Sequence, residues 1–189
     1  MKIGFAMCGS FCTFSQVFPV MQQLAGAHTL VPIFSPAVMA TDSRFGTAQA
    51  HWQQAAAICG REPICSIAQA EPIGPKKLLD VLVIAPCTGN TLGKLSHGIA
   101  DTAVTMAAKS HLRNGRPVVL AISTNDGLAG AAENIGRLLG RRHFYFVPFR
   151  QDAPAGKPAS LVADFSLLPA AVAQAAAGVQ LQPMLLGPG

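Results

Sequence analysis

The segment 79–86 constrains the fold of this chain more than any other. Its sequence is Leu-Asp-Val-Leu-Val-Ile-Ala-Pro, so it is apolar at almost every position instead of alternating between apolar and polar residues. A strand with one face in water alternates in this way, whereas a strand of a parallel sheet is covered by helices on both faces and is apolar throughout. The segment therefore predicts a central strand of a parallel sheet with helices packed on both sides.

The rest of the chain alternates between short apolar runs and amphipathic stretches. Further strands are predicted at 2–7, 28–34, 117–122 and 144–148, with a weak one at 64–67. Helices are predicted at 14–25, 42–60, 92–112, 131–139 and 167–177, and a loop at 151–158. This alternation favours an α/β fold with three αβα layers around a parallel, Rossmann-like or flavodoxin-like sheet. We expect one domain at 1–178 and a C-terminal tail at 179–189.

The composition bears on the partners of the chain. Half of its 189 residues are hydrophobic and 12% are charged, which predicts surfaces that are buried in a homo-oligomer. No run is long enough for a membrane helix, and the net charge of +5 is not arranged as the aromatic-interleaved basic stripe of nucleic-acid binders. We therefore expect neither a membrane nor a nucleic acid as partner. The five cysteines form no CxxC pair and are expected to be reduced thiols of a cytoplasmic protein.

Polar residues follow the predicted strands at the points where the strands end. In a parallel sheet these points share one edge, and such folds bind their ligands there. Hydroxyl groups and free backbone N–H groups at helix starts suit a phosphate. The residues at these points are Gly9, Ser10, Phe11, Ser35, Pro86, Thr88, Gly89, Asn90, Thr91, Ser123 and Asn125. Together they predict a site for a phosphate-bearing cofactor.

The glycine pattern of the first loop narrows the choice of cofactor. The first loop contains Gly4 and Gly9 but is neither GxGxxG nor GxxxxGK[ST], so the usual NAD and ATP signatures are missing. FMN has one terminal phosphate and needs neither signature, so we predict FMN. The histidines show no metal-ligand spacing and no nucleophile–base pair is evident, so neither a metal site nor a catalytic residue is assigned. Cys87, with no histidine near it in sequence, is interpreted as a buried structural thiol.

The segment 85–101 resembles a known family. It begins Ala-Pro-Cys-Thr-Gly-Asn-Thr-Leu-Gly-Lys-Leu and ends His-Gly-Ile-Ala-Asp. This segment is similar to the flavin-binding segment of the flavoprotein family, in which an apolar strand is followed by P-x-[ST]-x-N-T, a helix and G-I-A-D. The family contains cysteine-type decarboxylases and flavin prenyltransferases. The resemblance implies an FMN phosphate held by Gly9, Ser10 and Ser35. It implies a flavin ring near Thr88, Asn90 and Thr91.

Further segments resemble one branch of that family. They are 41–46, 70–80, 122–126, 145–149 and 181–183, so the similarity extends over essentially the whole chain. The branch consists of B subunits of an oxidoreductase that makes a planar dicarboxylate during sporulation, beside an A subunit that resembles NAD(P)-dependent dehydrogenases. The resemblance thus implies an A subunit and a small-molecule dicarboxylate as partners. The residues expected to bind the substrate are Arg44, Lys76, Lys77 and Asn125.

Two departures from the family bear on the reaction. The decarboxylases have a histidine before the central strand, where this chain has the segment 70–74, Ala-Glu-Pro-Ile-Gly. The prenyltransferases have an arginine where this chain has Ser123 and Thr124. Both departures disfavour those activities. The hypotheses that stay open are an oxidoreductase subunit with a share in catalysis and a non-catalytic accessory subunit that activates the A subunit, with a flavin-dependent decarboxylase as a less favoured third.

Overall fold

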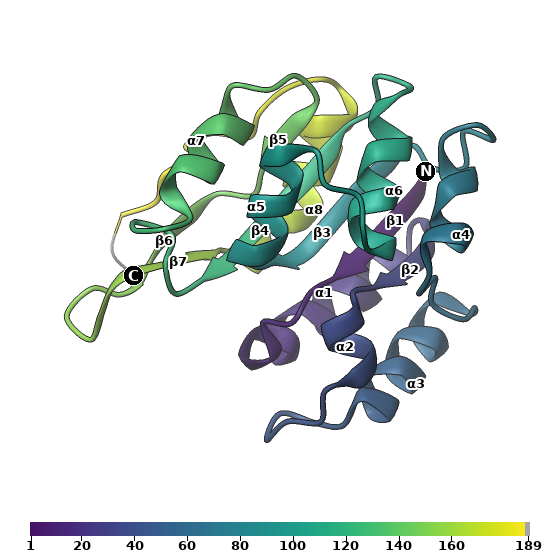
Figure 1. The fold of residues 1–189 in the computed structure, drawn as a ribbon, viewed down its shortest axis with the longest axis horizontal. Coiled ribbons are helices and arrows are strands. Elements are labelled where there is room, and N and C mark those ends of the chain that lie inside the picture. Colours follow the sequence, from purple (N-terminus) through teal and green to yellow (C-terminus); the bar gives the residue numbers. More distant parts are fainter. Residues whose placement is uncertain (188–189) are drawn as a thin grey trace.

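The computed structural model describes residues 1–187 of the chain, which fold around a seven-stranded sheet (Figure 1). Five parallel strands lie in the order β2 (Thr29–Phe34), β1 (Lys2–Met7), β3 (Val81–Cys87), β4 (Val118–Thr124) and β5 (Phe144–Phe146). The first residues of β4 pair with β5. Its last two residues pair with β7 (Lys157–Ala163), which forms an antiparallel hairpin with β6 (Phe149–Ala153).

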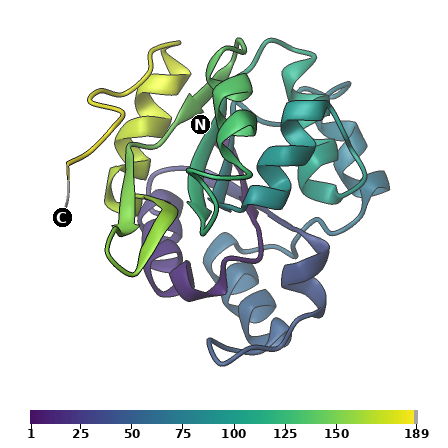
Figure 2. The ribbon, with the colours of Figure 1, turned by 60° about the vertical axis from the view of Figure 1, so that its left-hand side comes forward.

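Helices cover both faces of the sheet (Figure 2). One face carries α1 (Phe14–Ala25) and α8 (Leu168–Ala176), which contact each other. The other face carries α5 (Gly89–His97), α6 (Ala103–Leu112) and α7 (Ala132–Leu139). Beyond β2 lie α2 (Pro36–Ala40) and α3 (Ala48–Cys59), while α4 (Ile67–Ala70) packs on α6. The predicted three-layer α/β fold is confirmed, with an antiparallel hairpin added to its parallel sheet.

The centre of the sheet is buried, as the apolar run 79–86 predicted. Every residue of β3 is buried, and Phe5 of β1 is fully inaccessible. At Gly4, a Cβ atom would lie 2.5 Å from Leu79 Cδ1 and 2.9 Å from Leu82 Cδ1. The glycine thus leaves room for the side chains of Leu79, just before β3, and Leu82, within it, because the interior is too closely packed to hold a Cβ atom as well.

Two predicted helices have different bounds in the structure. The helix predicted at 42–60 begins only at Ala48, because Gly46 has a φ of +131° and the Thr47 side chain accepts a hydrogen bond from the Ala50 N–H. The helix predicted at 92–112 is divided into α5, which already begins at Gly89, and α6. Gly98, with a φ of +72°, ends the first, and Thr102 caps the second.

Segments predicted without helices differ as well. In the weak strand predicted at 64–67, only Ile64 forms an isolated bridge, and Ser66 then caps α4 through a reciprocal pair of bonds with Gln69. The helix α2, which follows Ser35 directly, was not predicted. The loop predicted at 151–158 is instead the turn and adjoining residues of the β6–β7 hairpin. Its polar side chains face the solvent and a pocket, so the segment lacks the apolar character of a buried strand.

The residues after α8 return to the sheet. The Gln180 side chain accepts a hydrogen bond from the Phe146 N–H at 2.8 Å and donates one to the Phe146 carbonyl at 2.7 Å. The Leu186 N–H donates to the Phe149 carbonyl at 2.9 Å. The boundary predicted at 178 stays a prediction, and the last two residues of the predicted tail lie outside the described residues. No helix within 1–187 is long and apolar enough to cross a membrane.

Candidate functional site

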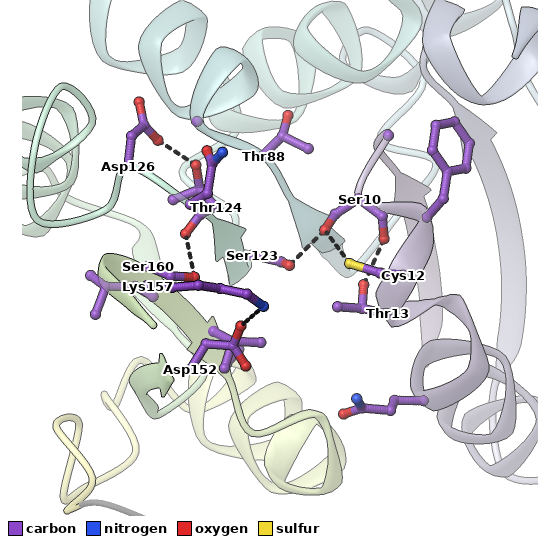
Figure 3. Close-up of a pocket in the computed structure, with 18 of the residues that line it drawn as sticks. Ser10, Cys12, Thr13, Thr88, Ser123, Thr124, Asp126, Asp152, Lys157 and Ser160 are labelled. Atoms are coloured by element: carbon purple, nitrogen blue, oxygen red, sulfur yellow. Dashed lines mark hydrogen bonds and ion pairs between the residues drawn. The ribbon is translucent and has the colours of Figure 1, made fainter. Parts of the chain in front are cut away.

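A pocket of about 950 Å³ lies at the carboxyl edge of the parallel strands (Figure 3). The loops after β1, β3 and β4 form one side of it, and the β6–β7 hairpin forms the other. The chain passes from β1 to β2 on one side and has β3 on the other, so the pocket lies where the strand order reverses. The predicted site residues that line it are Gly9, Ser10, Phe11, Thr88, Gly89, Asn90, Ser123 and Asn125.

The loop after β1 is tied to its neighbours by hydrogen bonds. The Ser10 and Ser123 hydroxyl oxygens are 2.7 Å apart, which joins the ends of β1 and β4 across β3. The Thr13 hydroxyl donates to the Ser10 carbonyl at 2.8 Å, across the single helical turn Phe11–Thr13 that leads into α1. These bonds hold neutral hydroxyl groups together at one end of the pocket, without any ion pair.

Ser35 lies behind this wall rather than in it. Its N–H donates to the Met7 carbonyl at 3.1 Å, so it is adjacent to the start of the β1 loop. Its hydroxyl is buried and has no hydrogen-bond partner. A Cβ atom at Gly9 would lie 3.1 Å from Ala37 Cβ, so α2 approaches the glycine closely. Because a buried hydroxyl without a partner is costly, Ser35 is a donor that a ligand could satisfy.

The start of α5 forms the next part of the pocket. The Thr88 side chain caps the helix by accepting a bond from the Thr91 N–H, and the buried Thr91 hydroxyl donates to Cys8 Sγ at 3.2 Å. Thr91 and Pro86 are both buried behind the wall and do not line the pocket. A Cβ atom at Gly89 would lie 2.7 Å from Thr124 Oγ1 and 2.8 Å from Asp126 Oδ1. Glycine at this position therefore allows the β4 loop to approach the helix.

The hairpin forms a charged wall that the sequence analysis missed. Arg150 Nη2 donates to Asp164 Oδ2 at 2.8 Å, and Lys157 Nζ donates to Asp152 Oδ2 at 2.7 Å. The other residues that line the pocket are Cys12, Thr13, Gln16, Ser43, Phe45, Thr124, Asp126, Ser160, Leu161, Val162 and Ala163. The signal that could have revealed the hairpin is the segment 154–156, Pro-Ala-Gly, a turn sequence between two short runs.

Three cations that were predicted to bind substrate do not line the pocket. Lys76 and Lys77 are exposed and precede β3, so they lie at the amino edge of the sheet, a full strand length from the pocket. Arg44 is exposed, and its guanidinium lies 4.8 Å from the centre of the Phe45 ring, which does line the pocket. Within the described part of the chain, the lining cations are instead Arg150 and Lys157.

The thiols below the pocket are protonated. Burial raises the pKa of Cys8 to about 11, an effect that its hydrogen bond from Thr91 only reduces. Burial also raises the pKa of Cys87 well above its usual value. Since the thiolate is the nucleophile, neither group suits nucleophilic chemistry at neutral pH, and the interpretation of Cys87 as a buried thiol is confirmed. Among residues 1–187, no three His, Cys, Asp or Glu side chains are placed to hold a metal ion.

Relatives of the chain share both its sequence and its fold. It is 44% identical over 186 residues to the B subunit of dipicolinate synthase from Bacillus subtilis (strain 168), covering 98% of this chain and 93% of the relative. The crystal structure of the dipicolinate synthase B subunit from Bacillus halodurans matches with a TM-score of 0.91 at 41% identity, covering 100% of this chain and 97% of the other. The branch that the segments of the sequence resemble is therefore that of these B subunits.

A more distant structure agrees in fold alone. The FMN-dependent cysteine decarboxylase SpaF matches with a TM-score of 0.67 at 24% identity, covering 93% of this chain and 97% of the other. The family model described as Flavoprotein matches residues 1–134, which include β1 to β4 and the loops after them. With that match and the full-length likeness to the B subunits, this chain belongs to the flavoprotein family.

Proposed function

We propose that this chain is the B subunit of a dipicolinate synthase, that it binds FMN, and that it takes part in oxidising dihydrodipicolinate to dipicolinate during sporulation. Its family and its full-length similarity to such B subunits support this proposal. The observation that carries the cofactor assignment is the pair of serine hydroxyls that follow the neighbouring strands β1 and β2. There Ser10 lines the pocket, and Ser35 has a buried hydroxyl without a partner.

The residues present fit a flavin nucleotide. Phosphate oxygens accept hydrogen bonds, and Ser10 can donate one from the pocket wall beside Gly9, which has no side chain. The unpartnered Ser35 hydroxyl lies just behind this wall and would be the second donor if the phosphate is seated against it. Thr88, Gly89 and Asn90 would hold the ring. The volume of about 950 Å³ is at the upper end of the range for small-molecule sites, so a planar dicarboxylate has room beside the flavin. When bound, FMN supplies two-electron redox chemistry.

The proposed partners are a dehydrogenase-like A subunit and further copies of this chain. The name of the relatives implies a second kind of subunit. Large apolar side chains are exposed at Ile99, Leu128 and Leu185, with 47%, 53% and 67% of their surface accessible. Such surfaces are typical of contacts between subunits. The compartment that we propose is the cytoplasm, where the five thiols would stay reduced.

Binding of FMN and riboflavin tests the cofactor assignment, because the two ligands differ only in the phosphate. Ser10→Ala should weaken FMN binding about ten- to a hundredfold, since a hydrogen bond to a charged group contributes roughly 1.5–3 kcal/mol. It should leave riboflavin binding almost unchanged. The matched control is Ser15→Ala, an exposed serine of α1 that does not line the pocket. Equal affinity of the unmodified protein for FMN and riboflavin would refute the phosphate site.

The catalytic share is tested by mixing this chain with an A subunit. The proposal expects the mixture to oxidise dihydrodipicolinate faster than the A subunit alone, and Ser10→Ala to lower that rate with the FMN occupancy. If the rate is unaffected by the loss of FMN, the chain acts as an accessory subunit and the redox part of the proposal is wrong.

A further inference from the structure

The hairpin wall contains two cations that differ in how firmly they are held. Arg150 is on β6 and Lys157 begins β7, and both line the pocket. The Lys157–Asp152 pair is open to water, with 60% and 38% of the side chains exposed. The side chains of Arg150 and Asp164 are only 29% and 28% exposed. The second pair is therefore the better shielded of the two.

The carboxylate that pairs with Arg150 is itself fixed. Asp164 Oδ1 accepts bonds from the Ser166 N–H at 3.1 Å and the Ser166 hydroxyl at 2.5 Å, which caps the short helix Phe165–Leu167. Asp164 Oδ2 remains for the Arg150 guanidinium. Since both oxygens have assigned partners, the carboxylate cannot turn without breaking the cap. The guanidinium is thereby oriented before any ligand arrives.

Arg150 keeps donors for a second anion. A guanidinium has five N–H donors in a planar fork, and the bond to Asp164 uses only one nitrogen of it. A fork of this kind binds a carboxylate through two parallel hydrogen bonds. Because Asp164 balances the charge of Arg150, the selectivity comes from the direction of these bonds rather than from net attraction.

We infer that Arg150 is the residue that selects a carboxylate of the substrate, and that Asp164 positions it. The inference rests on the proposed function, because that function supplies a planar dicarboxylate as substrate. It assigns to Arg150 of β6 the role that was predicted for Arg44, Lys76 and Lys77. Lys157, whose ion pair is exposed and easily exchanged, has a smaller share.

The test compares two probes in metal-free buffer with FMN present: pyridine-2,6-dicarboxylate and its uncharged analogue pyridine-2,6-dicarboxamide. Arg150→Gln should weaken the dicarboxylate about ten- to a hundredfold and leave the dicarboxamide unchanged. Arg150→Lys loses the planar fork but keeps an ammonium that can donate single hydrogen bonds, so it should weaken the dicarboxylate by a smaller factor. The matched control is Arg137→Gln, because Arg137 also pairs with a carboxylate, Glu133, but lies on α7 outside the pocket.

FMN binding by each variant reports whether its pocket is folded. If Arg150→Gln fails to bind FMN, the dicarboxylate affinity of Arg150→Lys is used to test the inference instead. Dicarboxylate affinity equal to that of the unmodified protein in the FMN-binding variants overturns the inference and leaves the proposed function intact. The inference is also overturned if the variants lose affinity equally for the dicarboxylate and the dicarboxamide, because a purely structural role would affect both probes alike. If the unmodified protein binds neither FMN nor the dicarboxylate, the proposed function fails as well.

Discussion

The two walls of the pocket are built from different kinds of structure. The wall at the ends of β1, β3 and β4 consists of short loops on buried parallel strands, and its polar groups are mainly neutral hydroxyls and amides. The opposite wall is an antiparallel hairpin at the edge of the fold, with two ion pairs along it. The first offers fixed hydrogen-bond donors to a phosphate. The second offers the unused donors of Arg150, which Asp164 holds in place, and the more exposed cation Lys157. On the proposed function, the first wall would hold the cofactor and the second would select the substrate.

The largest expected effect is a loss of stability from a substitution in the core beneath the wall of parallel strands. Phe5→Ala removes a side chain that is fully buried between the layers, so the free energy of unfolding should fall by about 3–5 kcal/mol. Val162→Ala on the hairpin removes a half-buried side chain and should lower it by only about 1 kcal/mol. Urea unfolding of both variants measures the difference. Similar losses would show that the hairpin is as much a part of the core as β1.

An intermediate loss of stability is expected at acid pH, and it arises at a histidine that packs beside the parallel strands. His111 of α6 is buried, with Nε2 3.1 Å from the Pro117 carbonyl just before β4, and burial lowers its pKa from 6.5 to about 4. Between these values the unfolded chain takes up a proton that the folded chain does not. This contribution to stability is therefore complete above pH 6.5 and declines as the pH falls toward 4, by roughly 3 kcal/mol in total.

Unfolding by urea at several pH values between about 4 and 7 measures this effect. His111→Gln has no titrating group at the site, so its stability should change less over that range than the stability of the unmodified protein. A pH profile that is identical in both proteins would show that His111 is not responsible for the acid sensitivity.

The smallest effect is expected at the tip of the hairpin. Lys157→Gln removes the exposed ion pair with Asp152, and exposed pairs contribute little to stability because water and salt screen them. The midpoint of urea unfolding should stay within experimental error of the unmodified protein, both at low salt and at high salt. A clear loss that disappears in high salt would show that the charged wall stabilises the fold as well as serving the pocket.

Much of this molecule was predictable because its signals are local. The apolar run 79–86 predicted the central strand, and the hydroxyls that follow the strands predicted an edge lined by Ser10, Thr88 and Ser123. The hairpin was not predictable in the same way. It mixes buried apolar residues such as Phe149 and Leu161 with exposed polar residues around the turn, and it lines a pocket whose other side comes from loops far away in sequence.

The sequence by itself determined the layered α/β fold, the family, and the ends of the strands at which a ligand can bind, since all three depend on patterns within short segments. The tertiary structure alone decided which cations reach the pocket. Lys76 and Lys77 are near the central strand in sequence but precede it, whereas Arg150 reaches the pocket through β6. The physical reason is that the two ends of a parallel strand lie at opposite edges of the sheet, so residues before and after the same strand are far apart. The position of the hairpin depends on the pairing of β7 with the end of β4, a contact between distant segments that the residues of the hairpin do not specify alone.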